Sequence, residues 1–462
     1  MKNLNILTLL FVGILFSSCE SDFLEPDLTS RINGSNYFNS SEEIEMAVVN
    51  MYDGLQGVNS SSANDNHATQ VEFYLTEMRS DNTQTKASEG EAAQFENYTI
   101  ESNNGIVLDY YRSFYNVIYR ANLVLENLTA AADGDRNRFE AEAKFVRAHA
   151  YFNLVRLFGQ VPLISQVTGP EDTALAYTRA PLADIYTLIK DDLGFAAANL
   201  NNSSRTRASR AAAQGLLAKV HLTLGEYSDA KTHLEGVINS DDYSLEADFN
   251  DVFYNEDNNE TIFAIGYNPG GEDSQNFSSE WLNAVGRTSG VNYVTDDARE
   301  ALDDFGGSRT IVSYRVDVAQ PQFHQVAKFL PSEDFDLTKA GNDWIVLRYA
   351  DILLMYAEAV IAGQDGTNDA RAIDYFNQVR TRAGRPNANG VTKASLLQER
   401  RVELAFENHR LFDLIRFGVA QEVLSAFATD TGASFSSTDL LLPIPQREIG
   451  LSKGLLTQNP GY

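Results

Sequence analysis

Apolar residues recur every three or four positions in several long stretches of the chain, which predicts amphipathic helices. Ser40 or Ser41 is expected to cap the first helix, with Glu42 and Glu43 in its first turn. The stretches with this pattern are 41–55, 107–128, 136–158 and 182–199. The pattern indicates a chain built mainly from helices.

Two later segments have the pattern of tetratricopeptide-type helix pairs. Residues 209–238 contain two helical stretches around a turn at Gly225, and residues 347–382 repeat this arrangement. Residues 145–158 with 182–199 form a third, degenerate pair. Such pairs stack their apolar faces into one continuous core. The expected fold class is therefore mainly α, a tetratricopeptide-like scaffold of helix pairs.

Other regions lack the helical pattern. Residues 59–104 are rich in Ser, Asn, Gly and Thr, and residues 429–462 are irregular. Between them, 242–343 mixes Gly, Asn and Asp with short β-like runs at 261–267, 310–318 and 325–330. Long irregular segments inside a compact domain usually carry function. We therefore expect irregular, partly β inserts at about 59–104 and 265–345 to form the ligand face.

The N-terminus has the pattern of a secretory signal, a basic start followed by an apolar run at 4–16 that is too short for a permanent membrane helix. Phe16-Ser17-Ser18-Cys19 is similar to a bacterial lipoprotein cleavage site, so Cys19 is expected to carry lipid. An ordinary signal peptide with an incidental cysteine is the alternative. The expected division is a signal peptide (1–18), a lipidated tether (19–36) and a single domain (37–462).

Composition narrows the classes of partner and site. The formal net charge of −28 disfavours nucleic acid and anionic lipid headgroups as partners of the folded body. Cys19 is the only cysteine, so no intramolecular disulfide or thiolate metal cluster can form. None of the six histidines stands in a metal-binding or catalytic motif. We therefore expect no metal-ligating residue and no cofactor, and whether a structural metal is bound stays open.

The C-terminal third carries the most specific motif. Residues 399–416 read ERRVELAFENHRLFDLIR, which resembles the signature of the SusD/RagB-like family. Residues 348–359, 442–445 and 458–462 are similar to other motifs of that family, and so is the DFLE that follows Cys19. On this combination the chain is identified as a member, with the signature region at 347–462.

The resemblance implies a function without catalysis. It implies a cell-surface lipoprotein, anchored in the outer membrane through lipid at Cys19, that captures an oligosaccharide or polysaccharide. The partner that it implies is a SusC-like TonB-dependent transporter, which imports the glycan. Two other classes stay open, a tetratricopeptide-type protein-interaction scaffold and a helical glycoside hydrolase with two carboxylates.

The charges of the signature favour a structural role. If the segment is one helix, Arg400, Glu403, Glu407 and Arg410 lie three or four positions apart and form a ladder of charge pairs. Asp413 and Arg416 would tie the end of the helix to a neighbour. A second polar cluster, at 296–309, is expected to be a salt-bridge network, and the acidic loop 255–260 is expected to be solvated rather than a calcium site.

Aromatic residues in the later insert are the first candidates for glycan binding, because a ring face stacks on the C–H side of a sugar. Trp281 and Trp344 are the only tryptophans, and both fall in this insert. Tyr293 is a third candidate, with Asn292 as a hydroxyl partner. Core packing is the alternative for both tryptophans.

The early insert offers both rings and polar groups. Tyr74 and Phe95 alternate with polar residues, and Asp81 and Asn82 can bond vicinal hydroxyls, although a turn cap is an equal alternative. Arg79 can bridge two hydroxyls or pair with a uronate. A neutral glycan is slightly favoured.

Overall fold

The computed structural model describes residues 37–57, 71–85, 90–256, 258–270, 273–275, 277, 292–317, 320–330 and 340–462. The predicted signal peptide, the tether with Cys19, and Trp281 lie outside these residues. Within the described ranges, no helix is both long and apolar enough to cross a membrane.

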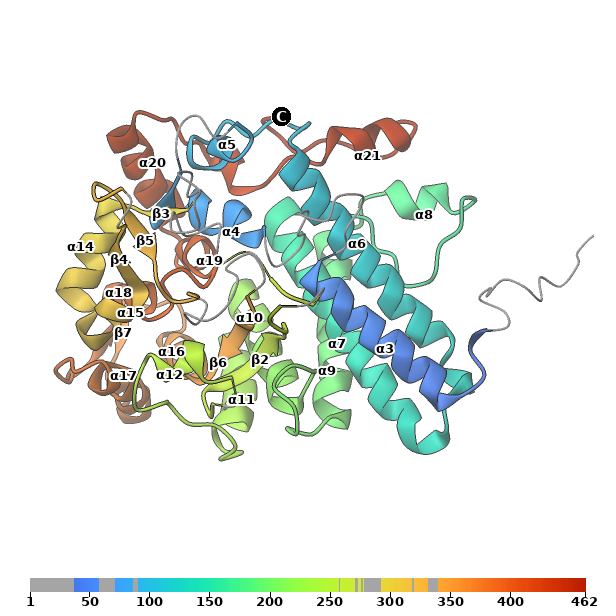
Figure 1. Cartoon of the computed structure of the whole chain (residues 1–462), viewed down its shortest axis with the longest axis horizontal. Helices are drawn as coiled ribbons and strands as arrows, with labels where there is room; N and C mark the ends of the chain where they lie inside the picture. The colour runs from blue at the N-terminus through green and yellow to red at the C-terminus, as the bar shows by residue number, and fades with distance from the viewer. Residues whose placement is uncertain are drawn as a thin grey trace, which may run out of the picture.

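The long helices pack on one another in chain order, each against the next (Figure 1). They are α3 (Ser41–Gln56), α6 (Gly105–Glu126), α7 (Asp133–Phe158), α9 (Leu182–Asn199), α10 (Arg210–Leu224), α11 (Tyr227–Ile238), α16 (Tyr349–Ile361) and α17 (Ala370–Arg382). The prediction of a mainly α scaffold of helix pairs is confirmed. The two clearest predicted pairs are α10 with α11 and α16 with α17.

Local capping explains where these helices begin and end. The Ser40 side chain accepts a hydrogen bond from the backbone N–H of Glu43, and Ser209 accepts one from Ala212 at the start of α10. Gly225 ends α10 with φ of 73°, a left-handed conformation that favours glycine. The turn predicted at Gly225 is therefore the turn that separates α10 from α11.

Shorter elements surround this stack. C-terminal to it lie α18 (Lys393–Glu403), α19 (Arg410–Arg416), α20 (Ala420–Thr431), η6 (Ser437–Leu440) and α21 (Gln446–Leu451). The others are α4 (Glu72–Leu75), η3 (Glu77–Arg79), α5 (Ala93–Glu96), η4 (Leu128–Ala130), α8 (Thr173–Tyr177), α12 (Asp251–Tyr254), α14 (Asp296–Phe305), η5 (Gly307–Arg309) and α15 (Thr310–Ser313). The region 429–462, expected to be irregular, thus contains short helices.

The strands form small antiparallel sheets. A four-stranded sheet has the order β1-β3-β5-β4, while β2 pairs with β6 and β7 pairs with β8. Their bounds are β1 (Thr83–Gln84), β2 (Thr261–Ile265), β3 (Tyr293–Val294), β4 (Tyr314–Val316), β5 (His324–Val326), β6 (Trp344–Arg348), β7 (Gly366–Thr367) and β8 (Val391–Thr392). The β-like run at 261–267 is largely β2, whereas the run at 310–318 begins as helix α15.

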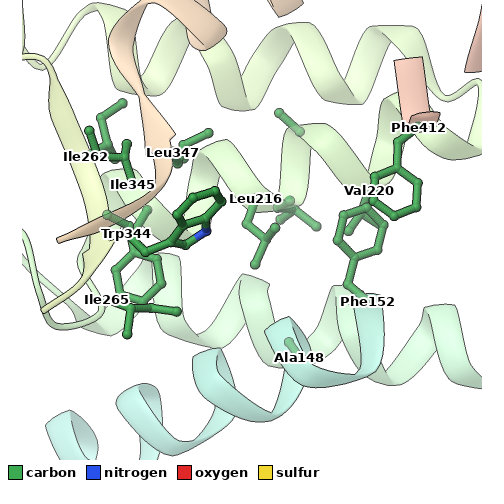
Figure 2. Close-up of a cluster of buried hydrophobic side chains, with 14 of the residues drawn as sticks. Ala148, Phe152, Leu216, Val220, Ile262, Ile265, Trp344, Ile345, Leu347 and Phe412 are labelled. Atoms are coloured by element: carbon green, nitrogen blue, oxygen red, sulfur yellow. The ribbon is translucent and has the colours of Figure 1, made fainter. Parts of the chain in front are cut away.

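The ribbon of β2 and β6 lies inside the protein, against α10 (Figure 2). Trp344, on β6, is 4% exposed and packs on Phe277 and Phe329, with ring centroids 5.4 and 4.9 Å away. Figure 2 shows its indole beside Leu216 of α10. The prediction that Trp344 forms an exposed stacking surface is therefore wrong, because β6 pairs with buried β2 and continues directly into α16.

His149 is a buried titratable group of this core. It lies on α7 and lines a cavity of about 40 Å³, and its Nδ1 has no hydrogen-bond partner among the described residues. Burial lowers the pKa of His149 to about 3, and repulsion from Arg156 and Lys219 acts in the same direction. The folded protein therefore holds this imidazole neutral.

Because the folded-state pKa lies below the ordinary value of 6.5, this group contributes stability that is present above pH 6.5 and lost as the pH falls towards 3. Between pH 7.5 and pH 5, the free energy of unfolding of the wild type should fall by about 2 kcal/mol more than that of His149→Met, because methionine has no titratable group. Urea unfolding of both proteins at the two pH values measures this difference. Parallel losses in the two proteins would contradict it.

Candidate functional site

The signature segment 399–416 is not one helix. Helix α18 ends at Glu403, and α19 begins only at Arg410. Between them, Phe406 and Asn408 adopt left-handed backbone with φ of 66° and 62°. The predicted ladder of neighbouring charge pairs along a single helix is therefore wrong, because the chain turns within it.

The carboxylates of the signature instead pair with distant residues. Glu403 is fully buried and pairs with Arg309, with Arg382, and with Arg348 at 2.6 Å. Glu407 pairs with Lys328 at 2.6 Å and with Arg348 at 2.7 Å. The structural role predicted for these charges is confirmed, with partners drawn from other elements.

The remaining charges of the signature bind α19 to the helix stack. Arg400 pairs with Asp413 and with Asp351 of α16, each at 2.8 Å. Arg416 pairs with Asp413 at 2.7 Å and with Glu358, also on α16. The predicted tie through Asp413 and Arg416 to a neighbouring helix is confirmed.

The polar residues predicted from the early insert face this interior. Asp81 is 2% exposed, and Arg410 donates to both of its oxygens at 2.7 Å. Burial acts to raise the pKa of Asp81, but Arg401 and Arg410 outweigh it and hold that pKa well below its ordinary value. The predicted contact of Asp81 with glycan hydroxyls is wrong, because its oxygens are occupied by guanidinium groups.

The same holds for the neighbours of Asp81. Arg79 is 1% exposed and donates to the backbone oxygens of Leu75 and Asp439. Asn82, also 1% exposed, donates to Glu77 and accepts from Arg401. These contacts contradict the prediction that Arg79 and Asn82 bind ligand. A buried polar group is stable only when its hydrogen bonds are made, and here protein groups make them, except at Arg79 Nε, which has no partner in the described part of the chain.

The predicted rings are also mostly internal. Phe95 is fully buried, and Tyr293 is 1% exposed and stacks on Phe323 with ring centroids 4.5 Å apart. Both contradict the prediction of an exposed stacking face. Tyr74 is half-buried beside Phe95, with ring centroids 6.0 Å apart.

The two predicted inserts nevertheless meet. Strand β1 of the early insert pairs with β3 of the later one, with Thr83 opposite Val294. Asn292 directly precedes β3; it is 1% exposed, and neither its amide oxygen nor its nitrogen has a hydrogen-bond partner in the described part of the chain. The sheet that they share is thus the junction of the inserts.

A cleft of about 660 Å³ opens where both inserts leave the scaffold. Its walls are the C-terminal half of α3, strand β2 with the segment that follows it, and the segment before α10. The lining residues are Val49, Tyr52, Asp53, Leu55, Gln56, Thr206, Arg207, Glu256, Phe263, Ala264, Ile265, Gly266, Tyr267, Asn268, Asp273 and Asp343.

A row of amides and carboxylate follows the edge of this cleft. The amide nitrogen of Gln56 donates at 2.6 Å to the backbone oxygen of Gly266 and to one carboxylate oxygen of Asp273. Asn268 donates to the other oxygen of Asp273. Asn268 and Asp273 are exposed. The row thus presents further lone pairs and N–H groups to solvent, which suits a ligand rich in hydroxyl groups.

The residues that line the cleft carry more negative than positive charge. Asp53, Glu256, Asp273 and Asp343 line it, with Arg207 as the only cation among the lining residues. Arg207 itself pairs with Glu45 and Glu142. An anionic ligand would therefore meet repulsion here.

Sequence reasoning missed Gln56, Asn268 and Asp273. The turn signal Asn268-Pro269-Gly270, at the start of the later insert, could have indicated an exposed loop there. The contact of Gln56 with that loop carries no sequence signal, because more than 200 residues separate the partners.

Comparison with known proteins places the chain. A family model described as "SusD family" matches residues 319–462, and a second, described as "Starch-binding associating with outer membrane", matches residues 22–222. The chain belongs to the SusD-like family. The segment 399–416 lies within the first match.

Relatives of this SusD-like chain agree over most of its length. The SusD-like protein P2 of Formosa agariphila is 27% identical, covering 82% of this chain and 85% of the relative. A solved SusD superfamily protein from Parabacteroides distasonis has a TM-score of 0.79 at 25% identity, covering 94% and 100% of the two chains. A laminarin-binding SusD-like protein has a TM-score of 0.76 at 26% identity, covering 92% and 100%.

The burial of Asp81 generates a stability prediction. Asp81→Asn should destabilise this SusD-like protein by about 3–5 kcal/mol, because Arg410 is left buried with an uncompensated charge. Equilibrium unfolding in urea measures the change.

Asp297→Asn is the matched control, since Asp297 pairs with the same Arg401 but its side chain is 57% exposed. This substitution should lower the free energy of unfolding by less than about 1 kcal/mol. Equal effects of the two substitutions would show that Asp81 is not the buried anchor of these arginines.

Proposed function

We propose that this chain is a cell-surface glycan-binding lipoprotein that captures an oligosaccharide or polysaccharide and delivers it to a TonB-dependent outer-membrane transporter. The observation that carries the binding step is the cleft between α3 and the segment after β2, with its row of Gln56, Asp273 and Asn268, of which the last two are exposed. Family membership and the laminarin-binding neighbour support the ligand class.

The ligand that we propose is a neutral glycan. Carboxylates outnumber cations among the residues that line the cleft, and its one arginine is paired with two glutamates. A uronate polymer would place its own carboxylates against this surface, whereas a neutral sugar meets only hydrogen-bonding groups. The rim offers amide donors and carboxylate acceptors, which together satisfy neighbouring hydroxyls.

Binding without cleavage is part of the proposal. In the cleft, Asp273 is held by two amides, and Asp53 pairs with Arg120 at 2.7 Å. A glycosidase needs one carboxyl group that is poised as an acid beside a second carboxylate. Incubation of the purified protein with each glycan that it binds, followed by an assay for new reducing ends, tests this point, and cleavage would favour the hydrolase alternative.

The cleft generates a binding prediction. Asn268→Ala and Asp273→Ala should each weaken binding of a neutral glucan such as laminarin about 10-fold, because each removes hydrogen bonds at the edge of the cleft. Affinity electrophoresis in gels that contain neutral or uronate-containing polysaccharides measures the binding. Retardation of the wild type is expected only in the gels that contain a neutral polysaccharide. Trp281→Ala tests the aromatic contact predicted from the sequence in the same gels.

Gln378→Ala is the control. Gln378 lines a separate groove of about 600 Å³ along α17, with the same kind of amide chemistry. This variant should be retarded like the wild type. Retardation lost in Gln378→Ala and kept in the two cleft variants would place the glycan at α17 and overturn the assignment of the cleft.

Anchoring and delivery generate another prediction. Cys19→Ala should abolish the incorporation of labelled palmitate and release the protein from the outer membrane, because Cys19 is the only residue that the N-terminal motif offers for lipid. The wild-type chain should co-purify with a TonB-dependent transporter from detergent-solubilised outer membranes. Palmitate incorporated into Cys19→Ala would contradict lipidation at Cys19. A wild-type chain that purifies without a TonB-dependent transporter would contradict the delivery step.

A further inference from the structure

We propose that the turn between α10 and α11 is a binding site for a divalent transition-metal ion of the zinc class. His221, Glu226 and Asp229 each direct one ligand atom to this turn, and these atoms lie within 4.8 Å of one another. Atoms that share one zinc ion at about 2.0–2.2 Å lie about 3.3 Å apart, so small side-chain rotations close the site.

The helix pair itself positions these ligands. His221 lies in the last turn of α10, Gly225 reverses the chain, and Asp229 lies in the first turn of α11. The imidazole of His221 is mostly buried, with its side chain 10% exposed, whereas that of Glu226 is 35% exposed. One ligand is thus held rigidly by packing, while the outer side remains open to an entering ion.

A second imidazole lies beside this cluster. His233 stacks on His221 with ring centroids 5.4 Å apart and planes 8° from parallel. It follows Asp229 by four residues on α11, so both side chains lie on one face of the helix. We assign His233 a positioning role, because its ring packs on that of His221 and holds the ligand imidazole in place.

The ligand set selects the class of ion. One imidazole with two carboxylates, completed by solvent, suits zinc, nickel or cobalt, while calcium and magnesium prefer sites built entirely from oxygen. A bound ion would join the end of α10 to the start of α11. The site therefore acts on the scaffold, independently of the glycan cleft.

In the absence of metal, the carboxylate of Glu226 is held by a hydrogen bond with His221 and by the ammonium group of Lys190. Nδ1 of His221 lies 2.5 Å from a carboxylate oxygen of Glu226. Lys190, from α9, donates to both oxygens of Glu226 at 3.1 and 3.2 Å. A metal ion takes the place of both, so Lys190 competes directly with it. Removing this lysine should strengthen metal binding.

Zinc titration of the tag-free mature protein, against a chromophoric chelator, tests the proposal. One zinc per chain is expected, with binding weakened at least about 10-fold in His221→Gln and in Asp229→Asn, and tightened in Lys190→Gln. Asp229 is exposed, so Asp229→Asn keeps the test valid if the buried His221 variant fails to fold. Cobalt should give a visible absorption band that is lost in His221→Gln.

Asp241→Asn is the matched control, because Asp241 is an exposed acid just beyond α11 and outside the cluster. Zinc binding that is absent in the wild type, or that is unchanged by Asp229→Asn and His221→Gln, would overturn the proposal. Binding weakened equally by Asp241→Asn would do so as well, since it would show attraction to a general acidic surface.

Discussion

Glu403 and Glu407 are buried carboxylates, and their charges require cations from several parts of the chain at once. Arg309 supplies one from η5, Lys328 another from the segment after β5, and Arg348 a third from β6, and further cations pair with the neighbouring residues of 399–416. A buried charge without a partner costs several kcal/mol, on the order of 3–5 when one member of a pair is removed. The fold is therefore constrained to bring these elements together around the turn between α18 and α19.

This constraint explains why the most recognisable polar residues do not form the ligand surface. Asp81 of the early insert is drawn into the interior by Arg410, and β1 then carries the insert against β3 of the later one. The network thus fixes the junction of the two inserts. Hydrogen-bonding groups that it leaves exposed, such as Asn268 and Asp273 at the cleft, remain for a ligand.

The scaffold contributes in a different way. In a stack of helix pairs each element contacts mainly its chain neighbours, so stability depends on each local interface. The α10–α11 turn is one such interface, held by His221, Glu226 and Lys190 at its outer edge. A metal ion there would reinforce the stack outside both inserts. Substitutions at the cleft would then change glycan binding, and substitutions at the α10–α11 turn would change metal binding, each without the other.

The sequence by itself determined the helix pairs, the cap at Ser40 or Ser41 and the turn at Gly225, because these features depend on residues close together in the chain. It also determined the family, through the order of residues in 399–416. Only the tertiary structure decided which polar and aromatic residues are exposed. Trp344 and Asp81 look like ligand contacts in their local sequence, yet strand pairing and ion pairs with distant residues bury both. The contact of Gln56 with Asp273 likewise appears only when the chain is folded, since no local pattern records a partner 217 residues away.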